Sequence, residues 1–96
     1  MKVVEFADEA REHAGNIDAW WRANRRAAPD LVTNELDKAS LTLAENPALG
    51  RRYEPRPGVR RLLLPRTRYH VYFVDEADRV LVVAIWGANR GRGPAL

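Results

Sequence analysis

The first half of the chain carries the apolar spacing of one short strand and two helices. Residues 2–6 alternate weakly between apolar and polar side chains, which favours a short strand. Two stripes with helical spacing follow, and each predicts one amphipathic helix. The first consists of Ala10, Ala14, Ile17 and Trp21, and the second of Val32, Leu36, Ala39 and Leu43.

The limits of both helices are marked by charge and by proline. Acidic residues crowd the start of the first helix and arginines its end, as the helix dipole favours. Pro29 suits the first position of the second helix. Asn46–Pro47 predicts the end of that helix, because the residue before a proline is pushed out of helical geometry. We therefore expect two antiparallel helices, an αα-hairpin.

The second half of the chain changes to a strand-like pattern. Residues 47–58 hold three prolines and two glycines and predict a loop. Three β-rich runs follow, at 59–64, 69–75 and 79–86, and the breaks between them predict hairpin connections. The last run is apolar on both faces, so we expect a central strand. The remainder, 87–96, reads as a basic tail.

These elements define one domain over residues 1–96 with the order β-α-α-β-β-β. An amphipathic αα-hairpin has one apolar face to bury, and a small sheet offers one face to receive it. We therefore expect an α+β fold in which the hairpin packs on one face of a small antiparallel sheet. The other face is expected to stay free for binding.

Composition excludes several classes of protein. The 96 residues contain no cysteine and two histidines, which argues against a disulfide scaffold, thiolate chemistry and a zinc site. The longest apolar run, Val80–Trp86, is far shorter than the ~20 residues that a bilayer requires. No phosphate-binding glycine loop or other cofactor motif is present. We expect a cytoplasmic protein without metal or cofactor.

Charge is distributed unevenly along the chain. The net charge is −3 over residues 1–48 and +6 over residues 49–96, and arginine outnumbers lysine 14 to 2. A basic half indicates an anionic partner such as nucleic acid or an acidic protein surface. Arginine suits this task because its planar fork binds phosphate and carboxylate in pairs of hydrogen bonds. The alternative is that GC-rich coding sequence alone supplies the arginines.

The predicted strands divide their polar side chains between two faces. Alternation places Arg68, His70 and Tyr72 on one face, with Tyr69, Val71 and Phe73 on the core face. Arg60 and Arg61 point to opposite faces, so only one of them can join a shared patch. The first set predicts a basic and aromatic surface that could stack bases and hold phosphates. The alternative is a solvated sheet face with no ligand.

Few residues could transfer protons beside these arginines. RNA cleavage by its own 2′-hydroxyl needs a base, an acid and cations that stabilise the transition state. His70 is the only histidine near the arginines, although a structural or surface role is the simpler interpretation. His13, on the first helix, is expected to be solvated and remote. Tyr53 could serve only if its loop folds back.

Four segments together resemble the RelE/ParE toxins of bacterial type II toxin–antitoxin systems. They are Asn46–Arg51, Gly58–Leu62, Arg68–Val74 and the strand end Trp86–Arg90. The resemblance implies a toxin that a cognate antitoxin neutralises in a hetero-oligomer, by wrapping the helices and the sheet. Trp20 and Trp21 cannot both be buried on one helical stripe, and we expect them to contact the antitoxin together with Arg25.

Two branches of this family differ in target. RelE-like toxins cut mRNA on the ribosome with an acid/base residue at or after the last strand, whereas ParE-like toxins inhibit DNA gyrase and need no hydrolytic centre. After Trp86 this chain has no Tyr, His, Glu, Asp or Lys. We therefore expect a ParE-like gyrase inhibitor, not an enzyme, with an arginine flank that lacks a proton donor. The expected target-binding residues are Arg60, Arg61, Arg66, Arg68, Tyr72, Arg90 and Arg92.

Two alternatives remain open at this point. In the first, the protein is a RelE-type, ribosome-dependent mRNA endoribonuclease. Arg61, Arg66 and Arg90 would then hold the phosphate, and His70 or Tyr72 would transfer protons. In the second, the toxin is degenerate and inactive.

Overall fold

The two stripes form two helices, and the β-rich runs form the strands that were expected. A computed structural model describes all of residues 1–96. Its elements are β1 (Val3–Phe6), α1 (Asp8–Asn24), α2 (Leu31–Glu45), the short 3-10 helix η1 (Pro47–Leu49), β2 (Arg51–Arg52), β3 (Arg60–Leu64), β4 (Tyr69–Asp75) and β5 (Arg79–Gly87). The predicted order β-α-α-β-β-β is confirmed, with β2 as an addition. Neither helix is long and apolar enough to cross a membrane.

The sheet is mixed, not wholly antiparallel. Its strand order is β1-β5-β4-β3-β2, and β2 to β5 pair antiparallel with their neighbours. β1 pairs parallel with β5, from Val3 opposite Arg79 to Phe6 opposite Val82. The expectation of a fully antiparallel sheet is therefore wrong. Alternation along a strand shows which face each residue occupies, but not the direction of the neighbouring strand.

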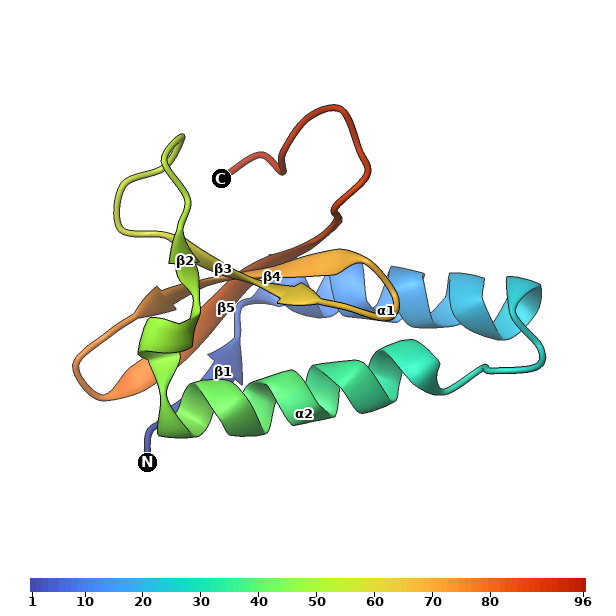
Figure 1. Cartoon of the computed structure of the whole chain (residues 1–96), viewed down its shortest axis with the longest axis horizontal. Coiled ribbons are helices and arrows are strands. Elements are labelled where there is room, and N and C mark those ends of the chain that lie inside the picture. Colours follow the sequence, from blue (N-terminus) through green and yellow to red (C-terminus); the bar gives the residue numbers. More distant parts are fainter.

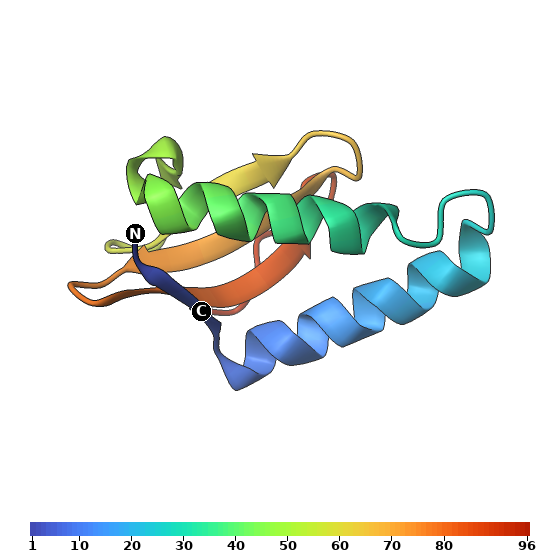
Figure 2. The ribbon, with the colours of Figure 1, turned by 90° about the horizontal axis from the view of Figure 1, so that it is seen from below.

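The two helices cover one face of this sheet. Figures 1 and 2 show α1 and α2 running in opposite directions, and in the view from below α2 lies in front of the strands. Their stripes meet the apolar side chains of β4 and β5, as expected. The buried core between these layers consists of Ala10, Ala39, Leu43, Leu64, Val71, Phe73, Val80, Val82 and Ile85. β5 supplies residues to both faces and pairs along both edges, so its predicted central position is confirmed.

The second face of the sheet is also covered, contrary to expectation. The loop between β2 and β3 and the tail after β5 lie on the side opposite the helices (Figure 1). There Val59, Tyr72 and Ala84 form a small second core, against which Tyr53 and Leu96 pack. The side chain of Tyr72 is only 2% exposed. The prediction that Tyr72 belongs to an open, base-stacking surface is therefore wrong, because segments without periodicity supply its cover.

Two details of the turns differ from the predictions. α2 begins at Leu31, after a turn in which the Leu31 N–H bonds to the Ala28 carbonyl, so Pro29 precedes the helix and does not start it. The expected loop at 47–58 contains η1 and β2. Gly50 lies between these two elements against the ring of Phe73, which a Cβ at this position would strike. Close packing of backbone on an aromatic ring thus fixes the start of β2.

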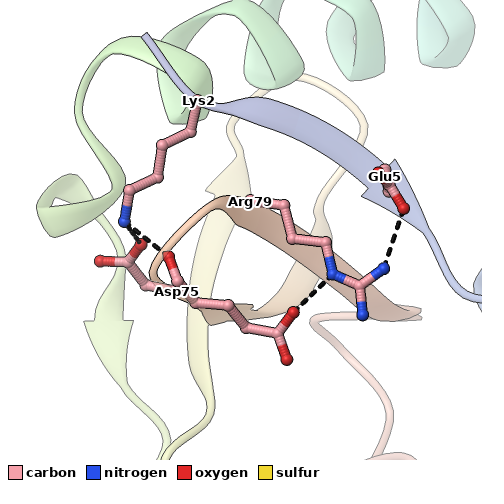
Figure 3. Close-up of polar contacts among 5 residues, drawn as sticks. Lys2, Glu5, Asp75 and Arg79 are labelled. Carbon is pink, nitrogen blue, oxygen red and sulfur yellow. Dashed lines mark hydrogen bonds and ion pairs between the residues drawn. The ribbon is translucent and has the colours of Figure 1, made fainter.

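Ion pairs hold the end of the sheet where β5 begins. Lys2 pairs with Asp75 at 2.5 Å, and Arg79 bonds to Glu5 at 2.9 Å and to Glu76 at 2.5 Å (Figure 3). These contacts join the parallel edge strand β1 to the turn between β4 and β5. At this end of the sheet the cations are therefore paired with carboxylates. At the opposite end the arginines have no carboxylate partners.

Candidate functional site

The end of the sheet where β5 finishes carries cations without carboxylate partners. Arg66 and Arg68 lie in the turn between β3 and β4, and Arg90 and Arg92 in the tail that follows β5. We call these four residues the basic end. None of them is in an ion pair, and of the arginines after residue 48 only Arg79 is in one. This half of the molecule therefore presents uncompensated positive charge.

A buried carboxylate fixes the turn that carries Arg66 and Arg68. Glu35, from α2, accepts hydrogen bonds from the Thr67 hydroxyl at 2.6 Å and from the backbone N–H groups of Thr67 and Arg66 at 2.9 and 3.0 Å. Burial by itself raises the pKa of Glu35, but these bonds and the charge of Arg66 outweigh it and leave the pKa below its ordinary value. The turn is thus anchored to a charged, fully hydrogen-bonded group.

Arg68 takes a backbone conformation that is uncommon for its type. Its φ of 65° lies in the left-handed region. Its carbonyl accepts a hydrogen bond from the N–H of Ala88 at 2.8 Å, which ties the turn to the tail after β5. The two segments that carry the basic end are therefore linked through their backbones.

Arg61 and His70 lie together on the second face of the sheet. The Arg61 guanidinium lies 5.3 Å from the ring centre of Tyr53 and 3.4 Å from the hydroxyl of Tyr72. Tyr53 reaches this face because its loop folds back, which places its ring 5.0 Å from that of Tyr72. Burial lowers the pKa of His70, and the charges of Arg61 and Arg68 lower it further. His70 is therefore a neutral imidazole among cations.

A hollow opens between α1, the start of β4 and the end of β5. It has a volume of about 610 Å³, and no carboxylate lines it. Its wall residues include His13, Trp20, Arg68, Tyr69, Trp86 and Arg90. The Arg90 guanidinium lies 4.2 Å from the ring centre of Trp86. We call this hollow the α1–β5 pocket.

His13 belongs to this pocket, contrary to the expectation that it is remote and solvated. Its Nδ1 accepts a hydrogen bond from the N–H of Ile85 at 3.2 Å, and its ring meets that of Trp86 edge to face at 5.7 Å. The bond is needed because β1 covers the edge of β5 only as far as Val82. The expectation that His70 is the only histidine near the arginines is therefore wrong, since His13 lines the same pocket as Arg68 and Arg90.

The structure separates other residues that the sequence grouped. The guanidinium of Arg60 donates to the Gly50 carbonyl at 2.8 Å, away from the Arg61 face, as the alternation predicted. The charge of Arg66 acts on Glu35, on the α2 side of the turn. Arg92 contributes its carbonyl, which accepts the indole N–H of Trp86 at 2.9 Å. Arg60 and Arg66 thus stand apart from the Arg61–His70 pair.

Trp20, Trp21 and Arg25 gather near the end of α1. The Arg25 guanidinium lies 5.0 Å from the ring centre of Trp20 and 5.9 Å from that of Trp21. Trp21 packs inward, and its indole N–H donates to the Tyr69 hydroxyl at 3.1 Å. Trp20 is 46% exposed. As expected, the two tryptophans are not both buried.

Comparison with known proteins identifies the family to which this chain belongs. The family model described as the ParE toxin of the type II toxin–antitoxin system parDE matches residues 4–91. A solved structure, the chromosomal ParDE toxin–antitoxin system from P. aeruginosa, is similar with a TM-score of 0.77. Identity to it is 18%, and the alignment covers 93% of this chain and 98% of that one. No curated protein matches the chain.

The class of protein follows from the family match. The chain is a toxin of the type II toxin–antitoxin class, with two helices packed on one face of a small mixed sheet. Within that class it belongs to the ParE toxin family, since the family model spans nearly all of its residues.

Proposed function

We propose that this toxin inhibits DNA gyrase by binding, without hydrolysis, and that a cognate antitoxin neutralises it in a hetero-oligomer. The observation that carries the proposal is the match of the ParE toxin model over residues 4–91. The toxin then acts in the cytoplasm, where gyrase meets the chromosome. Arg61, on the second face of the sheet, and the arginines of the basic end have no carboxylate partners, so they suit an anionic target surface.

The burial of Tyr72 supports a binding function over a nucleolytic one. A tyrosine that is 2% exposed cannot reach a ribose or a leaving oxygen, so it is no general acid or base. One observation favours the ribonuclease alternative, namely the neutral imidazole of His70 beside Arg61. A base of this kind would still need a partner acid, and the candidate on this face is Tyr53, whose ring lies 5.0 Å from that of Tyr72.

The test is a supercoiling assay with purified toxin, gyrase and relaxed plasmid. We expect supercoiling to stop in the presence of the toxin and to resume when the cognate antitoxin is added, with relaxation by a type I topoisomerase unaffected. Intact supercoiling at high toxin excess would refute the proposal. If mRNA on translating ribosomes were cut in the same preparation, and the cut required His70, the ribonuclease alternative would replace it.

Arginine variants locate the target-binding surface. We expect Arg61→Gln and Arg90→Gln each to weaken inhibition about tenfold or more, since a hydrogen bond to a charged group is worth about 1.5–3 kcal/mol. Arg56→Gln, in the exposed loop between β2 and β3, is the matched control and should inhibit as the wild type does.

A further inference from the structure

The α1–β5 pocket brings positive charge and aromatic rings together. It combines two guanidinium groups, Arg68 and Arg90, with the indole rings of Trp20 and Trp86. Neither guanidinium has a carboxylate partner anywhere in the protein. A guanidinium group that is already paired with a carboxylate needs no ligand. The guanidinium groups of Arg68 and Arg90 instead face an open hollow. The pocket is therefore suited to an anion that also carries a flat apolar part.

The size and the polar groups of the pocket narrow the ligand further. Its volume of about 610 Å³ lies within the range of about 300–1,000 Å³ of small-molecule sites. The side chains of Asn16 and Asn89 also line it. A carboxamide offers a donor and an acceptor side by side, which is the pattern that base edges require. The indole rings can contact a base, the carboxamides can bond to its edge, and the two guanidinium groups can bind its phosphate.

The arginines outside the pocket favour a polymer over an isolated nucleotide. Arg66 and Arg92 flank Arg68 and Arg90 along the same turn and tail, and they too are unpaired. A strand with a phosphate at every residue can contact such a series, whereas an acidic peptide supplies carboxylates only where its sequence has them. A base must also be unstacked to enter the pocket, which single strands permit.

We propose that the α1–β5 pocket binds one unstacked nucleotide of a single-stranded nucleic acid. Arg68 and Arg90 hold its phosphate, Trp20 contacts the base, and the strand leaves along the basic end. His13 shapes this pocket, because its bond to the Ile85 N–H holds α1 against the uncovered edge of β5. No bond is made or broken in this step. The inference goes beyond gyrase inhibition and does not depend on it.

The experiment measures the binding of a fluorescein-labelled single-stranded dT octamer to the purified toxin by anisotropy. We expect binding at low salt, and a loss of about tenfold or more with Arg90→Gln and with Arg68→Gln. The double variant should lower the slope of log K against log salt by about 0.7, since the two arginines share one phosphate and each phosphate contact on a single strand contributes about 0.7. Arg52→Gln, on the far edge strand β2, is the control and should bind normally.

A second measurement uses the wild-type protein, so it does not depend on how the variants fold. An octamer with 5-iodo-deoxyuridine should crosslink under light to Trp20 or Trp86. The inference would be overturned if the octamer crosslinked to other residues or did not bind the toxin. It would also be overturned if the double variant bound the octamer as tightly as the wild type does. So would tighter, Arg90-dependent binding of a Glu- and Trp-containing peptide, which would make the pocket a peptide site.

The supercoiling assay separates this inference from the proposed function. Gyrase inhibition without octamer binding would remove the nucleotide site and leave the function standing. Octamer binding without gyrase inhibition would do the reverse.

Discussion

The carboxylate of Glu35 on α2 and Thr67 in the turn between β3 and β4 form a closed pair of hydrogen bonds, 32 positions apart in sequence. One carboxylate oxygen receives both the hydroxyl and the backbone N–H of Thr67, and the other receives the N–H of Arg66. No polar atom of this group is left unpaired in the interior. The helical layer thus controls the turn that presents Arg66 and Arg68.

Replacing this carboxylate should destabilise the fold. We expect Glu35→Gln to lower the free energy of unfolding by about 2 kcal/mol, because an amide turns one acceptor into a donor that faces N–H groups. Thr67→Val should cost about 1 kcal/mol, since it removes only the hydroxyl bond. Urea unfolding measures both. Glu54→Gln, in an exposed loop, is the control, and an equal effect there would contradict the assignment.

The same pair predicts a dependence on acid. The pKa of Glu35 is lower in the folded protein than in the unfolded chain, so the unfolded chain binds the proton first as pH falls. Its stabilising contribution is complete above the ordinary carboxyl pKa of about 4.3 and is lost as pH falls through the folded pKa. The stability difference between wild type and Glu35→Gln should therefore be constant above about pH 5 and narrow below about pH 4. Urea titrations across this range measure it, and a gap independent of pH would contradict it.

The imidazole of His70 should respond to its two arginines. Burial lowers its pKa, and Arg61 and Arg68 add to that shift, so Arg61→Gln should raise the pKa of His70. Because the folded pKa is depressed, the contribution of His70 to stability is present above about pH 6.5 and is lost as pH falls. NMR titration of the imidazole protons measures the shift. Arg52→Gln should leave it unchanged, and no rise in Arg61→Gln would rule out the electrostatic contact.

The bond between His13 and Ile85 should protect the uncovered edge of β5. His13→Ala leaves the Ile85 N–H without a partner, which should lower the free energy of unfolding by about 1–3 kcal/mol. Hydrogen exchange at the Ile85 amide should quicken more than at Val80, which lies within the stretch of β5 that β1 covers. Glu12→Ala, on the same helix and exposed, is the control. Unchanged exchange at Ile85 would show that the bond does not form in solution.

Trp20 and Trp21 should separate partner binding from folding. Trp20→Ala removes a half-exposed ring and should leave stability within about 0.5 kcal/mol while weakening antitoxin binding about tenfold or more. Trp21→Ala should unfold the protein more readily, because its indole bonds to Tyr69 in the packed layer. Calorimetric titration with the cognate antitoxin measures the first effect. Leu49→Ala, also exposed, is the control. Full antitoxin affinity in Trp20→Ala would move the docking surface elsewhere.

The elements of this fold could be predicted because their signals are local. The stripe of Ala39 and Leu43 and the alternation at Val71 and Phe73 each follow from the geometry of one helix or one strand, and all four residues are in the core. The direction of β1 could not be predicted in this way. Its neighbour β5 lies more than 70 residues later, and only packing of the whole chain decides their pairing.

The candidate site was less predictable than the fold. Arg61, His70 and Arg90 were found as residue types on strands and in the tail, but the cover on Tyr72 comes from Tyr53 and Leu96, in segments without periodicity. His13 was predicted to be solvated because its position on α1 is typical of polar surface. One signal could have indicated this contact. Where a strand extends beyond its neighbour, its backbone N–H groups need another hydrogen-bond acceptor.

The central place of β5 has a consequence for biosynthesis. Since β5 pairs with both β1 and β4, the sheet cannot close until residues 79–87 have emerged from the ribosome. Until then β1, β4 and both helices lack β5, the strand against which they pack, because contacts between residues distant in sequence form last. The nascent chain therefore lacks a complete sheet for most of its translation, and the fold completes only when its last strand is released.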